Sequence, residues 1–131
     1  MIAVVDSSAL VMLFAVDSAV QNQALAVRLT QVIPHAPDIV DVEFHHALRG
    51  LAQGRKISPE RAELARSLYA QMPMERIPSR RLLDRVWSLR HNLGAYDACF
   101  LALAEALDVP LITCDEKQRR VDGHQAQVEA Y

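Results

Sequence analysis

Short apolar runs, each bounded by polar or turn-forming residues, recur along the chain. Such runs are typical of strands that are buried on both faces of a parallel sheet. They predict five strands, over residues 2–5, 32–33, 74–77, 109–114 and 128–131. The last run is short and polar, so we expect it at an edge of the sheet. Pro34 and Pro37 are expected to end the second strand in a turn, because proline restricts the backbone around it.

Between these runs the apolar residues follow helical spacing, and capping residues mark where helices begin. Asp6 precedes the first helix and Asp38 the third, Ser58 with Pro59 opens the fourth, and Gly54 ends the third. The predicted helices cover residues 9–14, 19–31, 38–53, 59–71, 79–91 and 95–107. Strands that alternate with helices predict an α/β fold, a three-layer α/β/α sandwich around a central, mostly parallel sheet of four to five strands.

Length and composition narrow the class of protein. With 131 residues we expect a single domain over 1–131, and with 51% hydrophobic but only 5% aromatic residues the core must be largely aliphatic. Asp6 and Asp17 interrupt the apolar N-terminus, so neither a membrane span nor a secretion signal is expected. Cys99 and Cys114 form no disulfide framework, which indicates a reducing, cytoplasmic setting.

The net charge of −2 hides a basic middle segment between two acidic ends. Residues 49–90 carry ten Lys or Arg against four acids, a net +6, while the segments on either side each carry −4. A basic segment of this kind can steer a polyanion toward an acidic pocket, although a solvated helical face explains it equally well. The candidate phosphate contacts in this segment are Arg49, Arg55, Lys56, Arg80 and Arg81.

Four carboxylates fall where an α/β sheet binds its ligands. Asp6 and Asp115 follow predicted strands, whose carboxyl ends carry the site in open sheets. Asp97 lies in the first turn of its helix, and Glu43 lies on or beside the apolar stripe of another, where a carboxylate needs a partner. Helix capping, or pairing with an arginine, could explain each acid alone. Crowded together they would repel one another, and a hard divalent cation would remedy this.

Other phosphate and metal chemistries need residues that this chain does not provide. A receiver domain needs paired acids after the first strand, and a haloacid-dehalogenase phosphatase needs Asp-x-Asp, whereas this chain has Ser8. His45 and His46 are adjacent on a helix and diverge, so they are expected to be exposed rather than to bind zinc. Trp87 is expected to pack in the core or in a dimer.

The acidic motifs together resemble those of a PIN domain. Residues 4–10 (VVDSSAL) are similar to its opening and residues 38–43 (DIVDVE) to its second motif, while residues 96–102 and 110–115 match the third and fourth. The size of the chain is most similar to VapC-type toxins of toxin–antitoxin pairs. The resemblance implies a Mg²⁺-dependent endoribonuclease, with Mn²⁺ as a substitute. It also implies a homodimer that an antitoxin protein holds inactive. The four acids beside the basic segment further predict single-strand-selective hydrolysis at structured RNA.

The resemblance assigns the four acidic positions of the family to Asp6, Glu43, Asp97 and Asp115. Asp6 and Asp97 are expected to be direct metal ligands, and the other two acids to complete the site through bound water. Ser8 and Thr113 are expected to hold carboxylates in place. Asp108 stands where a helix-ending glycine is common, which Asp tolerates because it can adopt the left-handed conformation.

Two other functions stay open at this point. An RNA-maturation nuclease of the same fold would carry the same acids without arresting growth. A catalytically silent interaction module would use the acidic pocket to bind a basic peptide. Which RNA a nuclease of this scaffold cuts would be set by loops and surface shape rather than by the acids.

Overall fold

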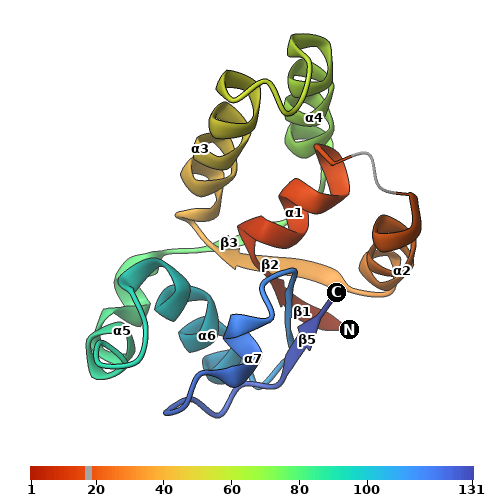
Figure 1. Ribbon diagram of the computed structural model, residues 1–131. Helices are drawn as coiled ribbons and strands as arrows, with labels where there is room; N and C mark the ends of the chain where they lie inside the picture. The colour runs from red at the N-terminus through yellow and green to blue at the C-terminus, as the bar shows by residue number, and fades with distance from the viewer. Residues whose placement is uncertain (17–18) are drawn as a thin grey trace.

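A five-stranded parallel sheet lies at the centre of the computed structural model, which describes residues 1–16 and 19–131 (Figure 1). The strands are β1 (Ile2–Val5), β2 (Ile33–Pro37), β3 (Glu75–Ile77), β4 (Leu111–Thr113) and β5 (Val128–Ala130). They follow the order β3–β2–β1–β4–β5, and every neighbouring pair is parallel. The predicted parallel sheet is therefore confirmed, with the fifth strand at an edge.

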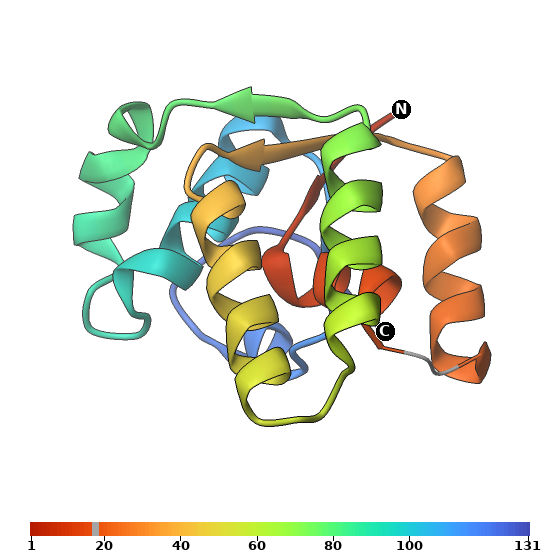
Figure 2. The ribbon, with the colours of Figure 1, turned by 90° about the horizontal axis from the view of Figure 1, so that it is seen from above.

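Helices cover both faces of this sheet. They are α1 (Ser7–Phe14), α2 (Ala19–Thr30), α3 (Val40–Gln53), α4 (Pro59–Gln71), the 3₁₀ turn η1 (Ser79–Leu82), α5 (Leu83–Ser88), α6 (Ala95–Leu107) and α7 (Lys117–Arg120). In Figures 1 and 2, α1, α3 and α4 lie on one side of the sheet and α5 and α6 on the other. The predicted three-layer α/β/α sandwich is confirmed.

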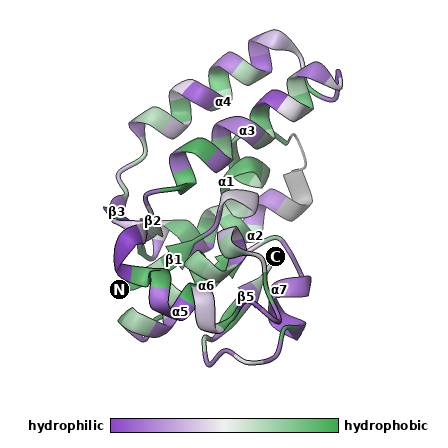
Figure 3. Cartoon of the chain, turned by 90° about the vertical axis from the view of Figure 1, so that its left-hand side faces the viewer, coloured by the Kyte–Doolittle hydropathy of each residue, from purple (hydrophilic) through white to green (hydrophobic). Residues whose placement is uncertain are grey.

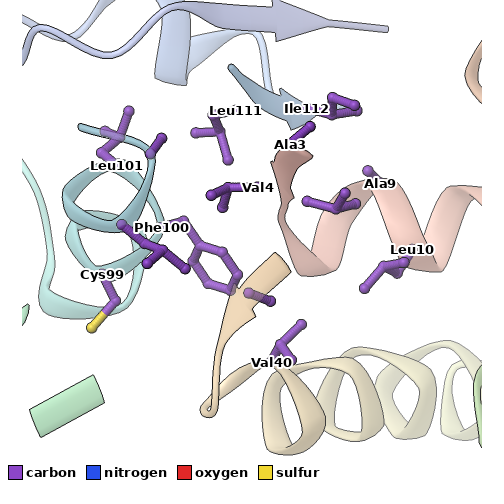
Figure 4. Close-up of a cluster of buried hydrophobic side chains, with 14 of the residues drawn as sticks. Ala3, Val4, Ala9, Leu10, Val40, Cys99, Phe100, Leu101, Leu111 and Ile112 are labelled. Atoms are coloured by element: carbon purple, nitrogen blue, oxygen red, sulfur yellow. The ribbon is translucent and has the colours of Figure 1, made fainter. Parts of the chain in front are cut away.

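The core is aliphatic on both faces of β1, as the composition requires. Figure 4 shows Phe100 of α6 facing Val4 of β1, with Leu111 of β4 beside them, while Ala9 and Leu10 of α1 lie on the opposite side. All five of these side chains are buried. Because helices cover both faces, the strand reads as an unbroken apolar run rather than an alternating one. Figure 3 shows the contrast between the apolar β1 and the polar surface helix α7.

The caps of two helices test the sequence predictions. Ser58 caps α4 as predicted, since its hydroxyl accepts the backbone N–H of Arg61 at 3.0 Å. The prediction that Asp38 caps the third helix is wrong, because α3 begins at Val40 with no side-chain cap. Asp38 instead accepts the backbone N–H of Ser79 at 3.0 Å. It therefore ties the end of β2 to the start of η1.

The prediction that prolines end the second strand is wrong, because β2 runs through both of them. Ile33 donates its N–H to Met1 beside β1, so Pro34 faces the opposite neighbour, β3. That strand begins only opposite His35, so no ladder bond is lost at Pro34. Pro37 is the last residue of β2 and faces the carbonyl of Val5, the last residue of β1, so only the final bond of that ladder is missing. Both prolines therefore lie where the ladder loses little.

The helix predicted over 79–91 is divided into η1 and a short α5. Backbone hydrogen bonds that span three residues mark both ends of this segment. The Arg81 N–H donates to the Pro78 carbonyl at 3.1 Å, and the Arg90 N–H donates to the Trp87 carbonyl at 3.2 Å. Val86 takes the buried position on α5, while Trp87 is 68% exposed. Of the two expectations for Trp87, packing in the core is therefore wrong, and packing in a dimer stays a prediction. The Trp87 ring lies 4.6 Å from the Arg90 guanidinium, a cation–π distance.

The long apolar helix α6 begins and ends where the sequence predicts. Its C-cap Asp108 has a φ of 53°, so the expected left-handed Asp is confirmed. In the described part of the chain, no helix combines the length and apolar character that crossing a bilayer requires. Asp17, which was expected to interrupt the apolar N-terminus, lies outside the described residues.

Candidate active site

The strand order changes direction between β1 and β4, and ligands of open α/β sheets bind beyond the carboxyl ends of strands at such a point. Asp6 directly follows β1. Thr113 is the last residue of β4, and Asp115 follows two residues later. The first turns of α3 and α6 contribute Glu43 and Asp97. The four predicted acids therefore come from four segments around this point of the sheet (Figure 1).

Asp6 is a buried carboxylate, only 4% exposed, that three donors hold in place. Ser8 donates to Oδ1 at 2.6 Å, Thr113 donates to Oδ2 at 2.5 Å, and the Ala9 N–H reaches Oδ1 at 3.1 Å. Burial raises the pKa of Asp6 to about 6, although these hydrogen bonds oppose the shift, and the negative charge of Asp97 adds to it. Asp6 therefore caps α1 and is held in one orientation by its donors.

Glu43 has a hydroxyl partner rather than an arginine. Ser7, the first residue of α1, donates to its Oε1 at 2.5 Å. The pKa of Glu43 is raised mainly by desolvation, and the nearby charge of Asp97 raises it further, while Ser7 and His46 act in the opposite direction. A half-buried carboxylate with a raised pKa is suited to accept a proton from water.

Asp97 links the other acids electrostatically. Its charge raises the pKa of Asp6 and of Glu43. The pKa of Asp97 itself is raised by desolvation and by the charge of Asp115, while hydrogen bonding from the Gln118 side chain stabilises its charged form. Such mutual effects require the carboxylates to lie in one region of the molecule.

Asp115 forms one hydrogen bond with the local backbone and another that joins it to the acidic cluster. Its Oδ1 accepts the Lys117 N–H at 3.0 Å, at the start of α7, as a helix-capping explanation expects. Its own N–H donates to the Thr113 hydroxyl at 2.9 Å. Thr113 thereby joins Asp115 to Asp6, and Ser8 lies 3.2 Å from the same hydroxyl. One hydroxyl network thus connects the ends of β1 and β4.

The donor set fits a hard divalent cation such as Mg²⁺ or Mn²⁺. Within residues 1–16 and 19–131, none of the four carboxylates forms an ion pair with a basic side chain. In the same residues no three His, Cys, Asp or Glu side chains lie close enough together to hold a metal ion between them. A cation here would have to be held by one or two carboxylates and by water, as Mg²⁺ commonly is in proteins.

Two polar residues at the site were missed by sequence reasoning. Ser7 was treated only as part of a helix cap, and its contact with Glu43 joins residues 36 positions apart. Gln118 on α7 is 2% exposed, and its Oε1 has no hydrogen-bond partner among the described residues. A polar residue inside a basic tetrapeptide gives no sign of burial, so the sequence offered no signal for Gln118.

A cavity of about 750 Å³ opens beside Glu43. Its walls come from the start of α1, the first half of α3 and the start of α6. Tyr96 and Val42 are its most exposed apolar side chains, at 66% and 74%.

The five candidate phosphate contacts are all exposed and occupy two places. Arg49, Arg55 and Lys56 lie at the far end of α3 and in the turn after it, whereas Arg80 and Arg81 belong to η1. Gln53, the last residue of α3, is about 15 Å along the helix from Glu43 at 1.5 Å per residue, and Arg55 follows in the turn. The turn η1 is tied through Ser79 to Asp38, next to the start of α3.

The histidines and cysteines take no direct part in the acidic cluster. His45 and His46 are both exposed on α3, as expected. Cys99 is buried and Cys114 partly buried, and neither forms a disulfide. Desolvation, with the charge of Asp6, raises the pKa of Cys114 to about 11, so its thiol stays neutral and unreactive.

Replacing Thr113 by Val should lower the free energy of unfolding by about 1–3 kcal/mol. The valine fits the space but removes the donor to Asp6 and the acceptor for the Asp115 N–H, both at a fully buried position. Urea unfolding measures the effect. Thr30→Val is the control, since its exposed hydroxyl bonds only to the Val27 carbonyl. Equal losses in the two variants would contradict the network's contribution.

Comparison with known proteins identifies a protein family that this chain matches. The family model of the PIN domain matches residues 3–124. Ribonuclease VapC1 of Mycobacterium tuberculosis is 39% identical over 102 residues, covering 77% of each chain. Ribonuclease VapC12 of the same organism is 35% identical over 126 residues and 96% of each chain.

A solved structure has the same fold at low sequence identity. It is VapBC2 from Rickettsia felis, bound to a DNA fragment from their promoter, and it aligns with a TM-score of 0.71. The alignment covers 99% of this chain and 98% of that one, with 15% identity, so it bears on the fold alone.

Proposed function

Because this chain belongs to the PIN-domain family of VapC-type ribonucleases, we propose that it is a divalent-metal-dependent endoribonuclease and the toxin of a toxin–antitoxin pair. The observation that carries the proposal is the group of four carboxylates without ion-pair partners, in the described residues, where the strand order changes direction. Unpaired acids that raise one another's pKa are costly for folding alone, and a cation would compensate for them.

Asp6 and Asp97 would hold Mg²⁺ or Mn²⁺ directly, with Glu43 and Asp115 completing the site through water. Such a cation offsets the negative charge that builds up on a phosphodiester during hydrolysis. Ser8 and Thr113 fix the Asp6 carboxylate in one orientation, so little reorganisation is needed on binding.

Glu43 is the proposed acceptor of the proton from the attacking water. Ser7 donates to Oε1, and in the described residues Oε2 has no hydrogen-bond partner and is left to accept that proton. As the water oxygen bonds to phosphorus, the bond to one ribose oxygen breaks. The raised pKa of Glu43 makes it a stronger base than an ordinary carboxylate.

The substrate we propose is a single-stranded stretch within a structured RNA. Replacing Arg80 and Arg81 together by Ala should weaken RNA binding and reduce the slope of log K against log salt by about 1.4, or 0.7 per phosphate contact. Both are exposed cations on η1, near the start of α3. Binding to a single-stranded RNA at several salt concentrations measures the slope.

Arg66→Ala is the control for that experiment, because Arg66 already pairs with Glu63 one turn away. A slope that stays the same in the Arg80 and Arg81 variant would contradict their role as phosphate contacts. A matching change for Arg49→Ala with Arg55→Ala would extend the contact surface to the far end of α3.

Incubation of the chain with total cellular RNA tests the enzyme proposal. Discrete new fragments should form with Mg²⁺ or Mn²⁺ and should be absent with EDTA. Cleavage that persists in EDTA would contradict the metal requirement. Absence of cleavage under all conditions, together with absence of divalent binding, would favour a silent interaction module instead.

The partner we propose is an antitoxin protein that covers the acidic pocket of a homodimer. Induction of the chain alone should arrest cell growth, and co-expression of its antitoxin should relieve the arrest. Normal growth despite active cleavage in vitro would favour an RNA-maturation nuclease.

A further inference from the structure

The cavity beside Glu43 is larger than the proposed chemistry needs. Its volume of about 750 Å³ lies in the range of sites that hold small organic groups. Glu43, Ser7 and Ser8 line it, and the same residues belong to the acidic cluster or hold it in place. The cavity is therefore continuous with the place where a phosphodiester would be cut.

The walls of this cavity suit an uncharged, flat group. Ile39, Val42 and Ala47 of α3 form one apolar wall, and the Tyr96 ring at the start of α6 contributes another. Residues of α3 and Tyr96 at the start of α6 line the same cavity, so these walls face one space. The Glu43 carboxylate repels a phosphate, and among the residues that the structure describes only His46 adds a basic side chain to the lining.

We propose that this cavity binds one unpaired nucleobase of the RNA, next to the phosphate that is cut, with the Tyr96 ring as its stacking surface. The inference rests on the proposed ribonuclease function and names a subsite for it. A base is the apolar, planar part of a nucleotide, and it lies within reach of the acids whenever the adjoining phosphate does. Tyr96 directly precedes Asp97, so one turn of α6 would carry both the stacking surface and an acid.

Stacking of one base on an aromatic side chain changes affinity by a factor of about five or more. Tyr96→Leu removes the ring, whereas Tyr96→Phe retains it and tests whether the ring rather than the hydroxyl is used. Trp87→Leu is the matched control, because Trp87 is an equally exposed aromatic residue outside the cavity. Both positions are on the surface, so none of the variants should unfold the protein.

The probes are a fluorescein-labelled RNA octamer of random sequence and an abasic octamer with the same sugar-phosphate chain. Binding is measured with Ca²⁺ as the divalent ion. The natural chain should bind the base-bearing octamer at least about fivefold more tightly than the abasic one. Tyr96→Leu should abolish this preference, while Tyr96→Phe and Trp87→Leu should keep it.

Photo-crosslinking tests independently where the base binds. A 4-thiouridine hexamer should crosslink to peptides that contain residues 39–47 or 95–97. Crosslinks confined to α5, or a base preference that Tyr96→Leu leaves unchanged, would overturn the inference. So would a Tyr96→Leu variant whose oligomeric state changes in sedimentation while its base preference does not, since the cavity would then belong to a protein interface.

Failure of the inference can be told apart from failure of the proposed function. If the natural chain cleaves total RNA but Tyr96→Leu keeps its base preference, only the subsite is wrong. If the natural chain shows the base preference but cleaves no RNA with any divalent ion, the subsite stands and the enzyme proposal fails.

Discussion

Asp97→Asn should lower the rate of RNA cleavage by more than about 100-fold while leaving the fold unchanged. Loss of a residue that only supports a metal ligand costs 10- to 100-fold, so loss of a proposed ligand should cost more. Asp97 also acts electrostatically on Asp6 and Glu43, so its removal alters the whole cluster. The residue is exposed on the first turn of α6, where the amide is accommodated without repacking.

The measurement is the initial rate of formation of one RNA fragment, with circular dichroism as the test of folding. Asp84→Asn is the matched control, since Asp84 is an exposed acid in the first turn of α5. It loses the same charge at a helix start but lies outside the cluster. A rate for Asp97→Asn within threefold of the control rate would contradict the role of the acids.

The second large effect is a loss of stability in the metal-free protein as pH rises from about 4 to 6. The pKa of Asp6 is about 6 in the folded state, against an ordinary value of 3.8 for an aspartate. In this window the folded state binds the proton more tightly than the unfolded state does. The free energy of unfolding therefore falls as the carboxylate ionises, by up to about 3 kcal/mol for a shift of this size.

Urea unfolding in EDTA at pH 4, 5, 6 and 7 measures this dependence in the natural chain and in Asp6→Asn. The difference between their unfolding free energies should move in favour of Asp6→Asn with increasing pH, because the amide carries no charge. Asn can also keep partners, since the Ser8 and Thr113 hydroxyls are able to accept as well as donate. A constant difference across the range would contradict the burial cost of Asp6.

The fold could be predicted because local signals agree with the tertiary structure. The Ser58–Pro59 pair fixes the start of α4, and the unbroken apolar run at residues 2–5 reports burial on both faces of β1. Predictions from local sequence failed where contacts with residues distant in the sequence decide the secondary structure. The prolines of β2 are tolerated because of the lengths of the adjoining strands, which their own sequence does not encode.

The candidate site was predictable only in part, for a similar reason. Asp6 and Asp115 stand at strand ends, which a one-dimensional pattern reveals. The partner of Glu43 is Ser7, far away in sequence, where an arginine had been the expected alternative. Gln118 lies among basic residues and is nevertheless buried, because α7 turns that one side chain inward.

The most direct test of the central claim is calorimetric titration of Mn²⁺ into the natural chain and into Asp97→Asn at pH 7. The claim is that the four acids form a divalent cation site, so the natural chain should bind Mn²⁺ with release of protons from carboxylates of raised pKa. Asp97→Asn should bind at least tenfold more weakly. Equal binding by both chains, or no binding by either, would contradict the account.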